Sequence, residues 1–438
     1  MLNRVYANPV DCDMLPRAER ERYQETALAR LLAECGGHPL VAERITGPLA
    51  LHNITPGESE DHSGAICGIG PYANRPSRDP GACIVFSTSG SSGTERRLVT
   101  SYQEIINNAR IHGKGYAACG VGSDHTLATF GEVGRFASEF AVIAALDMTG
   151  CTIVPLVDRL DITANVALFQ ELNVDALLAM PSELLGYLDH WETAPETVPA
   201  LRLVVTGGEP LPAPVRARLQ RLFGPELKVR GTFQTADAGT IGYQCTHCAD
   251  GEFHLHEELQ LVELLDESGQ AAAEGEMVVT NLYRREMPVI RMKTGDRAAW
   301  TSHAERCDCG RTSRRIRLLG RAARLLKIGG EKTSARALGD LGARMVPNGE
   351  LVQFVVSRDA GGGDVLTAHA CAFADPDRAR SARDTLLRDP CLGSLYARGR
   401  IVDLQVSGAL PTHLTGSKQK PRAVVDIRDD ASLKGHHT

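Results

Sequence analysis

Short apolar runs alternate with helix-like segments through the middle of the chain. The apolar runs that predict strands are Thr126–Phe130, Cys151–Pro155, Ala176–Met180, Leu201–Thr206 and Leu227–Phe233. The segments between them that predict helices include Glu139–Met148, Ile162–Glu171, Pro181–His190 and Pro212–Leu222. This alternation predicts an α/β fold in which helices cover mainly parallel sheets.

The pattern differs toward both ends of the chain. The segment Arg17–Cys35 predicts a helix with apolar residues on one side, and Gly36-Gly37 ends it. Strand-like runs separated by turns from about Phe253 to Trp300 predict a β-rich subdomain, and a compact α+β tail follows Gly320. A chain of 438 residues exceeds what one hydrophobic core usually supports. We therefore expect an N-terminal domain over residues 1–320, with its β subdomain at about 240–315, and a small mobile α+β lid domain over 321–438.

A loop rich in glycine and hydroxyl residues follows the apolar run Ala82–Phe86. It reads Phe86-Ser-Thr-Ser-Gly-Ser-Ser-Gly-Thr-Glu-Arg-Arg-Leu-Val99, and the next segment, Ser101–Arg110, predicts a helix. Between a strand and a helix, such a loop forms a cradle for phosphate from backbone N–H groups, hydroxyls and arginines. It lacks the Gly-Lys-Ser/Thr triplet of the common NTPase loop. A plain Ser/Gly surface loop is the alternative interpretation.

Composition and charge indicate an ordinary globular protein and argue against some classes of partner. Hydrophobic residues make up 43% of the chain and charged residues 23%, which is ordinary for a globular protein. A net charge of −6 argues against nucleic acid or an anionic membrane as the main partner. The sequence has no apolar run of the length that a membrane span needs and no apolar signal segment near Met1. We therefore expect a cytoplasmic protein.

Four of the 12 cysteines are grouped in two close pairs. Cys245-Thr-His-Cys248 and Cys307-Asp-Cys309 can supply four thiolates for a tetrahedral Zn²⁺ with a structural role. His254 or His256 could replace one ligand of the first pair. Iron–sulfur binding is disfavoured because Cys-x-Cys is an uncommon cluster spacing. Free, reduced cysteines are the remaining alternative.

Further short segments recur in a fixed order after the glycine-rich loop. They are Gly207-Gly208-Glu209-Pro210-Leu211, Thr232-Phe233-Gln234-Thr235-Ala236-Asp237, Arg285-Glu-Met-Pro-Val-Ile-Arg291, Thr294-Gly295-Asp296, Cys307-Asp-Cys309-Gly-Arg-Thr312, Gly320-Arg321 and Gly416-Ser-Lys-Gln-Lys420. Together they resemble the phenylacetate–CoA ligase branch of the adenylate-forming superfamily. The resemblance covers nearly the whole chain.

The resemblance implies a reaction in two halves. A carboxylate, by family default an aryl or arylacetic acid, attacks the α-phosphate of ATP and yields an acyl-adenylate and pyrophosphate. A thiol, usually coenzyme A, then displaces AMP. Such chemistry depends on neutralising phosphate charge and on positioning. The family resemblance also implies Mg²⁺ as a cofactor and a homodimer as the expected assembly.

The resemblance also assigns roles to individual residues. By this resemblance, the ATP phosphates would be bound by Thr88, Ser89, Gly90, Ser91, Ser92, Gly93 and Arg96. The adenine and acyl pocket would be lined by Gly207, Gly208, Glu209 and Pro210. Phe233 would stack on adenine, and further nucleotide contacts would come from Gln234, Thr235 and Lys327. Asp237 takes the place of the Mg²⁺ ligand, Asp296 would bind the ribose hydroxyls, and Arg321 would steady the ribose. The adenylation lysine is Lys420 or Lys418, depending on the alignment, and the first is favoured.

The chain departs from the family pattern at two places. Ala236 removes a hydroxyl, and Asp237 stands where a glutamate is usual. The hinge reads Gly320-Arg-Ala-Ala-Arg324 and lacks its usual acidic residue. Transfer of the acyl group to a carrier-protein thiol or an amine is therefore one alternative, and a catalytically reduced nucleotide-binding protein is another. The run Phe130–Phe136 is expected to line the acyl pocket, where Arg135 would pair with a second acidic group on the substrate or form a structural salt bridge.

Overall fold

The structure is a computed structural model, and it divides into two compact units. It describes residues 11–58, 83–88, 96–130, 138–156, 161–301, 306–321, 325–328, 331–346, 350–359, 363–409, 424–426 and 428. The larger unit lies within residues 1–320, and the smaller one consists mainly of residues 321–438. Each is described by itself below.

One hydrogen-bonded sheet runs through the larger unit in the order β11-β12-β13-β14-β10-β9-β8-β7-β6-β4-β5. Its parallel half consists of β5 (Thr152–Pro155), β4 (Thr126–Thr129), β6 (Ala176–Ala179), β7 (Leu203–Thr206) and β8 (Lys228–Thr235). Its antiparallel half consists of β9 (Gly239–Tyr243), β10 (Glu252–Leu255), β11 (Gln260–Leu265), β12 (Glu274–Asn281), β13 (Met292–Trp300) and β14 (Arg315–Arg321). The short β1 (Gly57–Glu58) pairs with β13. The α/β class is confirmed, and the expected β-rich region continues the same sheet.

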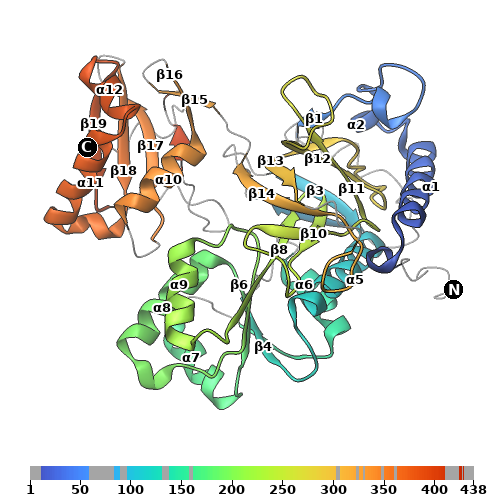
Figure 1. Cartoon of the computed structure of the whole chain (residues 1–438), viewed down its shortest axis with the longest axis horizontal. Helices are drawn as coiled ribbons and strands as arrows, with labels where there is room; N and C mark the ends of the chain where they lie inside the picture. The colour runs from blue at the N-terminus through green and yellow to red at the C-terminus, as the bar shows by residue number, and fades with distance from the viewer. Residues whose placement is uncertain are drawn as a thin grey trace. The chain divides into compact units, whose positions relative to one another are not determined.

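Helices cover both faces of the parallel half. Figure 1 shows α7 (Ile162–Glu171), α8 (Pro181–Thr193) and α9 (Ala213–Phe223) on one side of β4 and β6, and α5 (Tyr102–Cys119) and α6 (Ser138–Leu146) on the other. Alternate strand residues point to opposite faces. Leu127, Leu178 and Leu203 accordingly belong to the core formed with Tyr116 and Leu146.

The glycine-rich loop joins two strands, so the expectation that it leads into a helix is wrong. β2 (Cys83–Thr88) and β3 (Arg96–Ser101) pair antiparallel, with Thr88 opposite Arg96. Leu98 and Val99 are buried, and this burial favours a strand before the helix. Ser101 then caps α5 in a capping box with Glu104, so the start of this helix is occupied by its own side chains.

The N-terminal helix α1 spans Arg17–Cys35, as the sequence predicts, and α2 spans Pro39–Ala42. Buried Arg20 forms a salt bridge with Glu257 at 2.7 Å, and Gln24 donates to the Glu257 carbonyl at 2.8 Å. These contacts bind α1 to the segment between β10 and β11.

The smaller unit contains the sheet β19-β18-β17-β20. These strands span Ile401–Ser407, Asp364–His369, Gln353–Arg358 and Val424–Asp426, and the unit also contains α10 (Ala335–Met345), α11 (Pro376–Arg388), α12 (Leu392–Ala397) and the hairpin of β15 (Leu325–Ile328) and β16 (Glu331–Ser334). Its core is formed by residues such as Phe354, Leu366, Leu386 and Leu404.

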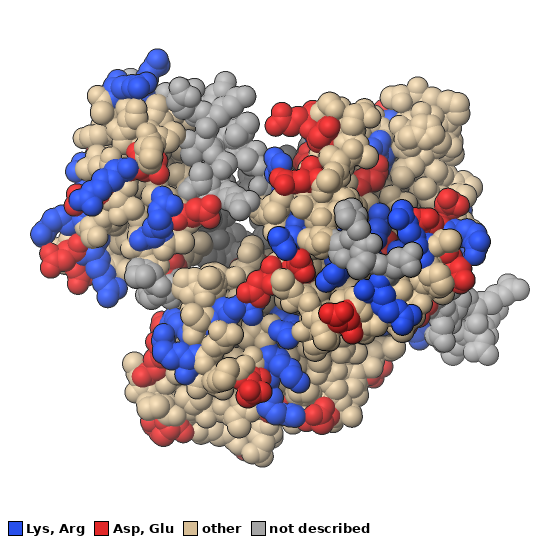
Figure 2. Space-filling model, in the orientation of Figure 1, with Lys and Arg blue, Asp and Glu red and all other residues tan. Residues whose placement is uncertain are grey.

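Charged side chains of both signs are interspersed over the described residues of the face drawn in Figure 2, without one extended patch of a single sign. Among the residues that the structure describes, no helix is both long enough and apolar enough to span a membrane.

Candidate functional site

Two of the segments singled out in the sequence leave the parallel sheet side by side. The loop Gly207–Pro210 follows β7. The segment Phe233–Asp237 starts in the last residues of β8 and continues into the turn after it. The two strands are parallel neighbours, with Thr206 paired to Gly231. A Cβ atom on Gly207 would lie 2.9 Å from the Thr232 hydroxyl, so a larger residue would displace the Thr232 side chain. Ligands of open α/β sheets bind at this carboxyl edge of the strands.

The loop after β7 is held in place by Glu209. Its carboxylate accepts hydrogen bonds from the Ser182 backbone N–H at 3.1 Å and from the Ser182 hydroxyl at 3.0 Å. Ser182 lies in the first turn of α8, where the helix dipole favours a negative charge. Gly208 has a φ angle of +76°, a conformation that suits glycine. These contacts assign Glu209 to positioning the loop.

Asp237 lies in the turn that joins β8 to β9, and it is 5% exposed. The Thr235 hydroxyl accepts a hydrogen bond from the Ala238 N–H at 3.1 Å and shapes the turn. Phe233 is partly buried, with its ring centroid 5.9 Å from that of Phe253. Phe233 thus lies two residues beyond the last pairing of β8 with β7, and Asp237 lies in the turn that follows.

Three side chains that the sequence does not single out hold this turn. Gln260 and Asn281 each donate an amide hydrogen bond of 2.8 Å to the Ala238 carbonyl, and the Arg284 guanidinium donates to the Asp237 carbonyl. Gln260 and Asn281 are opposite each other on β11 and β12. Their convergence is a matter of strand register, and no local sequence signal reveals it.

Asp296 lies in a β-bulge of β13. Between β12 and β13 the register shifts, so that Thr294, Gly295 and Asp296 stand opposite the single residue Met277. Gly295 has a φ angle of +73°, and the Thr294 hydroxyl donates to the Met277 carbonyl at 3.2 Å. The Asp296 N–H donates to the same hydroxyl at 3.1 Å. Bulges change the direction of a side chain, and this one sets the direction of Asp296.

Several residues assigned from the sequence lie outside the described part. The residues of which the structure describes neither backbone nor side chain are Ser89, Gly90, Ser91, Ser92, Gly93, Arg135, Lys418 and Lys420. For Thr88, Arg96, Arg321 and Lys327 the structure gives the strand but not the side chain, and the strands are β2, β3, β14 and β15.

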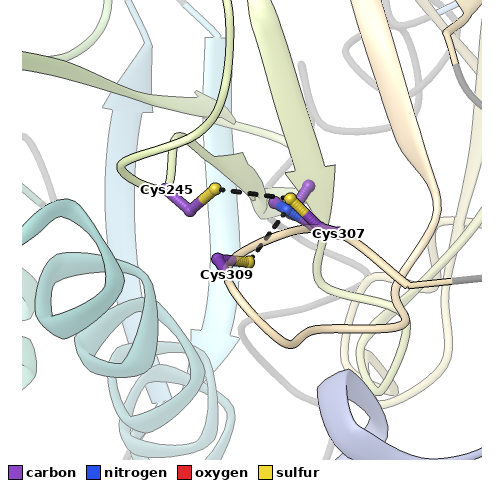
Figure 3. Close-up of side chains that lie close together, drawn as sticks. Cys245, Cys307 and Cys309 are labelled. Atoms are coloured by element: carbon purple, nitrogen blue, oxygen red, sulfur yellow. Dashed lines mark hydrogen bonds between the residues drawn. The ribbon is translucent and has the colours of Figure 1, made fainter.

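A cysteine and histidine cluster lies where the antiparallel half meets the loop before β14. One ligand atom each from Cys245, His254, Cys307 and Cys309 lies within 4.8 Å of every other. Cys245 Sγ is 3.9 Å from Cys307 Sγ, and Cys309 Sγ is 3.6 Å from His254 Nε2; the three sulfur atoms converge in Figure 3. Zn–S bonds of about 2.3 Å place thiolates about 3.8 Å apart on a tetrahedron. The donor set and spacing therefore fit zinc.

His254 enters the four-atom set in place of Cys248. Cys248 Sγ lies 3.6 Å from Cys245 Sγ but is not part of the set. On the other side of the ring, His254 Nδ1 is 3.0 Å from the Ser313 hydroxyl and 3.3 Å from the Ser313 carbonyl. A donor bond from Nδ1 to this carbonyl leaves Nε2 as the acceptor nitrogen that a metal requires.

Comparison with known proteins agrees with these features. The family model described as AMP-binding enzyme matches residues 18–270, more than half of the chain. The chain is 25% identical over 255 residues to a phenylacetate-coenzyme A ligase of Thermus thermophilus, in a match that covers 56% of each chain. It is 24% identical over 220 residues to a phenylacetate-coenzyme A ligase of Aromatoleum evansii, in a match that covers 48% of this chain and 49% of that protein. The matches thus span about half the length of these relatives.

Likeness to solved structures extends further along the chain. The structure of 2-hydroxyisobutyryl-CoA ligase in the postadenylation state, in complex with 2-HIB-AMP, superposes with a TM-score of 0.69 at 17% identity. That match covers 96% of this chain and 94% of the other, and at this identity it shows a shared fold. With the family model spanning both loops at the carboxyl edge, this chain is a member of the AMP-binding enzyme family, in its phenylacetate–CoA ligase-like branch.

Proposed function

We propose that this protein activates a carboxylic acid with ATP, releases pyrophosphate, and transfers the acyl group from the resulting adenylate to coenzyme A. The observation that carries the proposal is the buried Asp237 turn at the end of β8, next to the Gly207–Pro210 loop of β7. Membership of the AMP-binding enzyme family supports it. The acid is proposed to be aromatic or arylacetic, after the relatives named above.

The residues of the proposed site would have different roles in adenylation. Asp237 supplies a carboxylate, the ligand that Mg²⁺ prefers when it bridges phosphate oxygens. Asp296, directed by its bulge, would accept hydrogen bonds from the ribose hydroxyls. Phe233 offers a partly exposed ring to adenine. The lysine that would pair with the acyl carboxylate and the α-phosphate is Lys420 or Lys418.

We further propose that Cys245, His254, Cys307 and Cys309 hold a structural Zn²⁺. Four protein ligands leave no open position for a water molecule, which suits a structural rather than a catalytic site. The cluster would join three segments that are separate in sequence, namely the turn after β9, strand β10 and the loop before β14. A reducing compartment that supplies ATP, such as the cytoplasm, suits both the thiolates and the reaction.

A different acceptor is the second candidate. The hinge Gly320-Arg-Ala-Ala-Arg324 lacks an acidic residue, and this departure favours a carrier-protein thiol or an amine. If coenzyme A is the acceptor, it accelerates AMP release once the acid is known. AMP release that ignores coenzyme A and responds to an amine or a carrier protein would support the second candidate.

Acid-dependent exchange between ATP and labelled pyrophosphate tests the adenylation half directly. We expect exchange with one class among aryl, arylacetic, heteroaromatic and short aliphatic acids. Activity confined to dicarboxylic acids would support pairing of Arg135 with a second acidic group, and activity with monocarboxylic acids alone would remove that idea. Folded, zinc-loaded protein that shows no exchange with any acid would contradict the proposal and favour a catalytically reduced nucleotide-binding protein.

A further inference from the structure

The loop that joins β12 to β13 touches two parts of the proposed nucleotide site at once. Its residues Asn281 to Met287 reach the Asp237 turn on one side and the β2–β3 hairpin on the other. This hairpin carries the glycine-rich loop between its strands. The β12–β13 loop, the Asp237 turn and strands β2 and β3 all belong to the larger unit.

On the hairpin side, the loop is attached to β3 and to the start of α5. The Arg284 guanidinium donates to the Val99 carbonyl at 3.3 Å, and the Val99 N–H contacts Met287 Sδ at 2.9 Å. Buried Glu104 accepts a hydrogen bond from the Glu286 N–H at 3.1 Å through Oε1 and one from the Ser101 N–H at 2.9 Å through Oε2. The loop therefore follows any movement of β3.

On the turn side, Arg284 and Asn281 act together. Arg284 donates through Nη1 to the Asp237 carbonyl, and Asn281 donates through Nδ2 to the Ala238 carbonyl at 2.8 Å. The Asn281 Oδ1 atom accepts the Arg284 N–H at 3.0 Å, which fixes the backbone from which the guanidinium extends. Arg284 thus spans the distance between the backbone of β3 and that of the Asp237 turn.

The contacts of Arg284 leave one donor unmet. Its Nε atom is buried and has no hydrogen-bond partner among the described residues. An unmet buried donor lowers stability, so the Nε atom gains nothing from these contacts. Their arrangement instead serves the two carbonyls, which a planar guanidinium can bind at the same time.

We propose that Arg284 is a positioning residue that sets the separation between strand β3, at Val99, and the Asp237 turn. The inference rests on the proposed function, because the two parts matter together only when one holds the phosphates and the other holds Mg²⁺. Lysine would present a compact ammonium on a flexible stem in place of the rigid, planar fork, so it would hold the two carbonyls less firmly. Loss of the bridge therefore changes the alignment of phosphates and metal and leaves the acid pocket unchanged.

The test compares Arg284→Gln and Arg284→Lys with a matched control in the same loop. Arg285 carries the same charge, but its guanidinium binds Glu34 at 2.6 Å and the Leu282 carbonyl at 2.6 Å. In pyrophosphate exchange we expect Arg284→Gln to lower the maximal rate on the order of 10- to 100-fold, because misplacement of about 1 Å costs this much. We expect its Mg²⁺ requirement to rise, the acid KM to stay unchanged, Arg284→Lys to be intermediate and Arg285→Gln to match the wild type.

Two results would overturn the inference. One is Arg284→Gln with the rate and Mg²⁺ requirement of the wild type. The other is an equal loss in Arg284→Gln and Arg285→Gln that follows their melting temperatures, which would mark a purely structural loop. A wild-type protein without exchange would instead contradict the proposed function. Calorimetric titration with ATP and Mg²⁺ would then test Arg284 separately. Equal affinities of the wild type and Arg284→Gln for ATP with Mg²⁺ would exclude the positioning role of Arg284.

Discussion

The Glu209 carboxylate binds both the backbone N–H and the hydroxyl of Ser182, at 3.1 and 3.0 Å, and so fixes the loop after β7 to the first turn of α8. The contact joins one edge of the proposed nucleotide site to a helix that packs on the sheet. A glutamate in a family motif thereby acts as a cap on a neighbouring helix.

Glu209→Ala should weaken ATP binding because it removes both bonds that hold the loop, and Ser182→Ala should weaken it less because the bond from the Ser182 N–H remains. The double variant should lose little more than Glu209→Ala alone, with a coupling free energy of about 2 kcal/mol for the charge-assisted hydrogen bond from the Ser182 hydroxyl. Calorimetric ATP titration of the four proteins measures this coupling. Additive losses would show that the two side chains act independently.

Asp237→Asn should abolish most pyrophosphate exchange without unfolding the protein. The amide keeps the size of the side chain but removes the negative charge that a hard cation requires. Asp237→Glu restores the residue usual in the family and should retain activity at a changed Mg²⁺ optimum. Exchange rates measured over a Mg²⁺ series test both variants. Wild-type rates in Asp237→Asn would show that another group binds the metal.

Metal analysis can separate the two ligand sets for zinc. We expect about one equivalent in the wild type and in Cys248→Ser, and less than about half in Cys309→Ser and His254→Ala, because four-ligand sites bind tightly and are weakened by the loss of a ligand. Removal of zinc by a chelator should lower the melting temperature. Loss of zinc in Cys248→Ser with retention in His254→Ala would restore the all-cysteine set.

His112 should make the protein sensitive to acid. It is buried in α5, stacked on Tyr116 at 4.2 Å, and burial lowers its pKa from the ordinary 6.5 to about 4. Its Nε2 finds no hydrogen-bond partner within the described part of the chain. The unfolded chain therefore binds the proton first as pH falls. The free energy of unfolding should decrease between pH 6.5 and 4, by roughly 3 kcal/mol from this residue, and stay constant above that window.

His112→Phe keeps an aromatic ring on Tyr116 and cannot be protonated. Urea unfolding of both proteins across this pH range provides the comparison. The variant should lose the part of the slope that His112 causes, whatever its absolute stability. Parallel pH profiles of the two proteins would contradict the assignment.

Much of the fold follows from local patterns. The bounds predicted for the N-terminal helix and for the helix Ile162–Glu171 agree with α1 and α7. The central strands β4, β6 and β7 appear as short apolar runs because both of their faces are buried. Their order places the motifs after β7 and β8 at one edge, where the structure also has them.

Other features depend on pairing that no local pattern reveals. The sequence does not predict the β2–β3 hairpin because Arg96–Ser101 reads as the end of a polar loop, although Ser101 and Glu104 have the spacing of a capping box. The sequence names His254 only as an alternative ligand, and it completes the four-atom set in place of Cys248 because β10 brings it beside the loop before β14. The roles of Gln260, Asn281 and Arg284 likewise arise from strand register.

The hairpin of β8 and β9 ties the two proposed sites together. Asp237 lies at its tip, and Cys245 follows directly after the far end of β9. The tip is also held by Gln260, Asn281 and Arg284, so release of the base would loosen the tip only in part. With the proposed zinc ligation and activity, zinc starvation would loosen the base of this hairpin in a folded protein, and the supply of a metal that takes no part in the chemistry would influence how much active enzyme a cell contains.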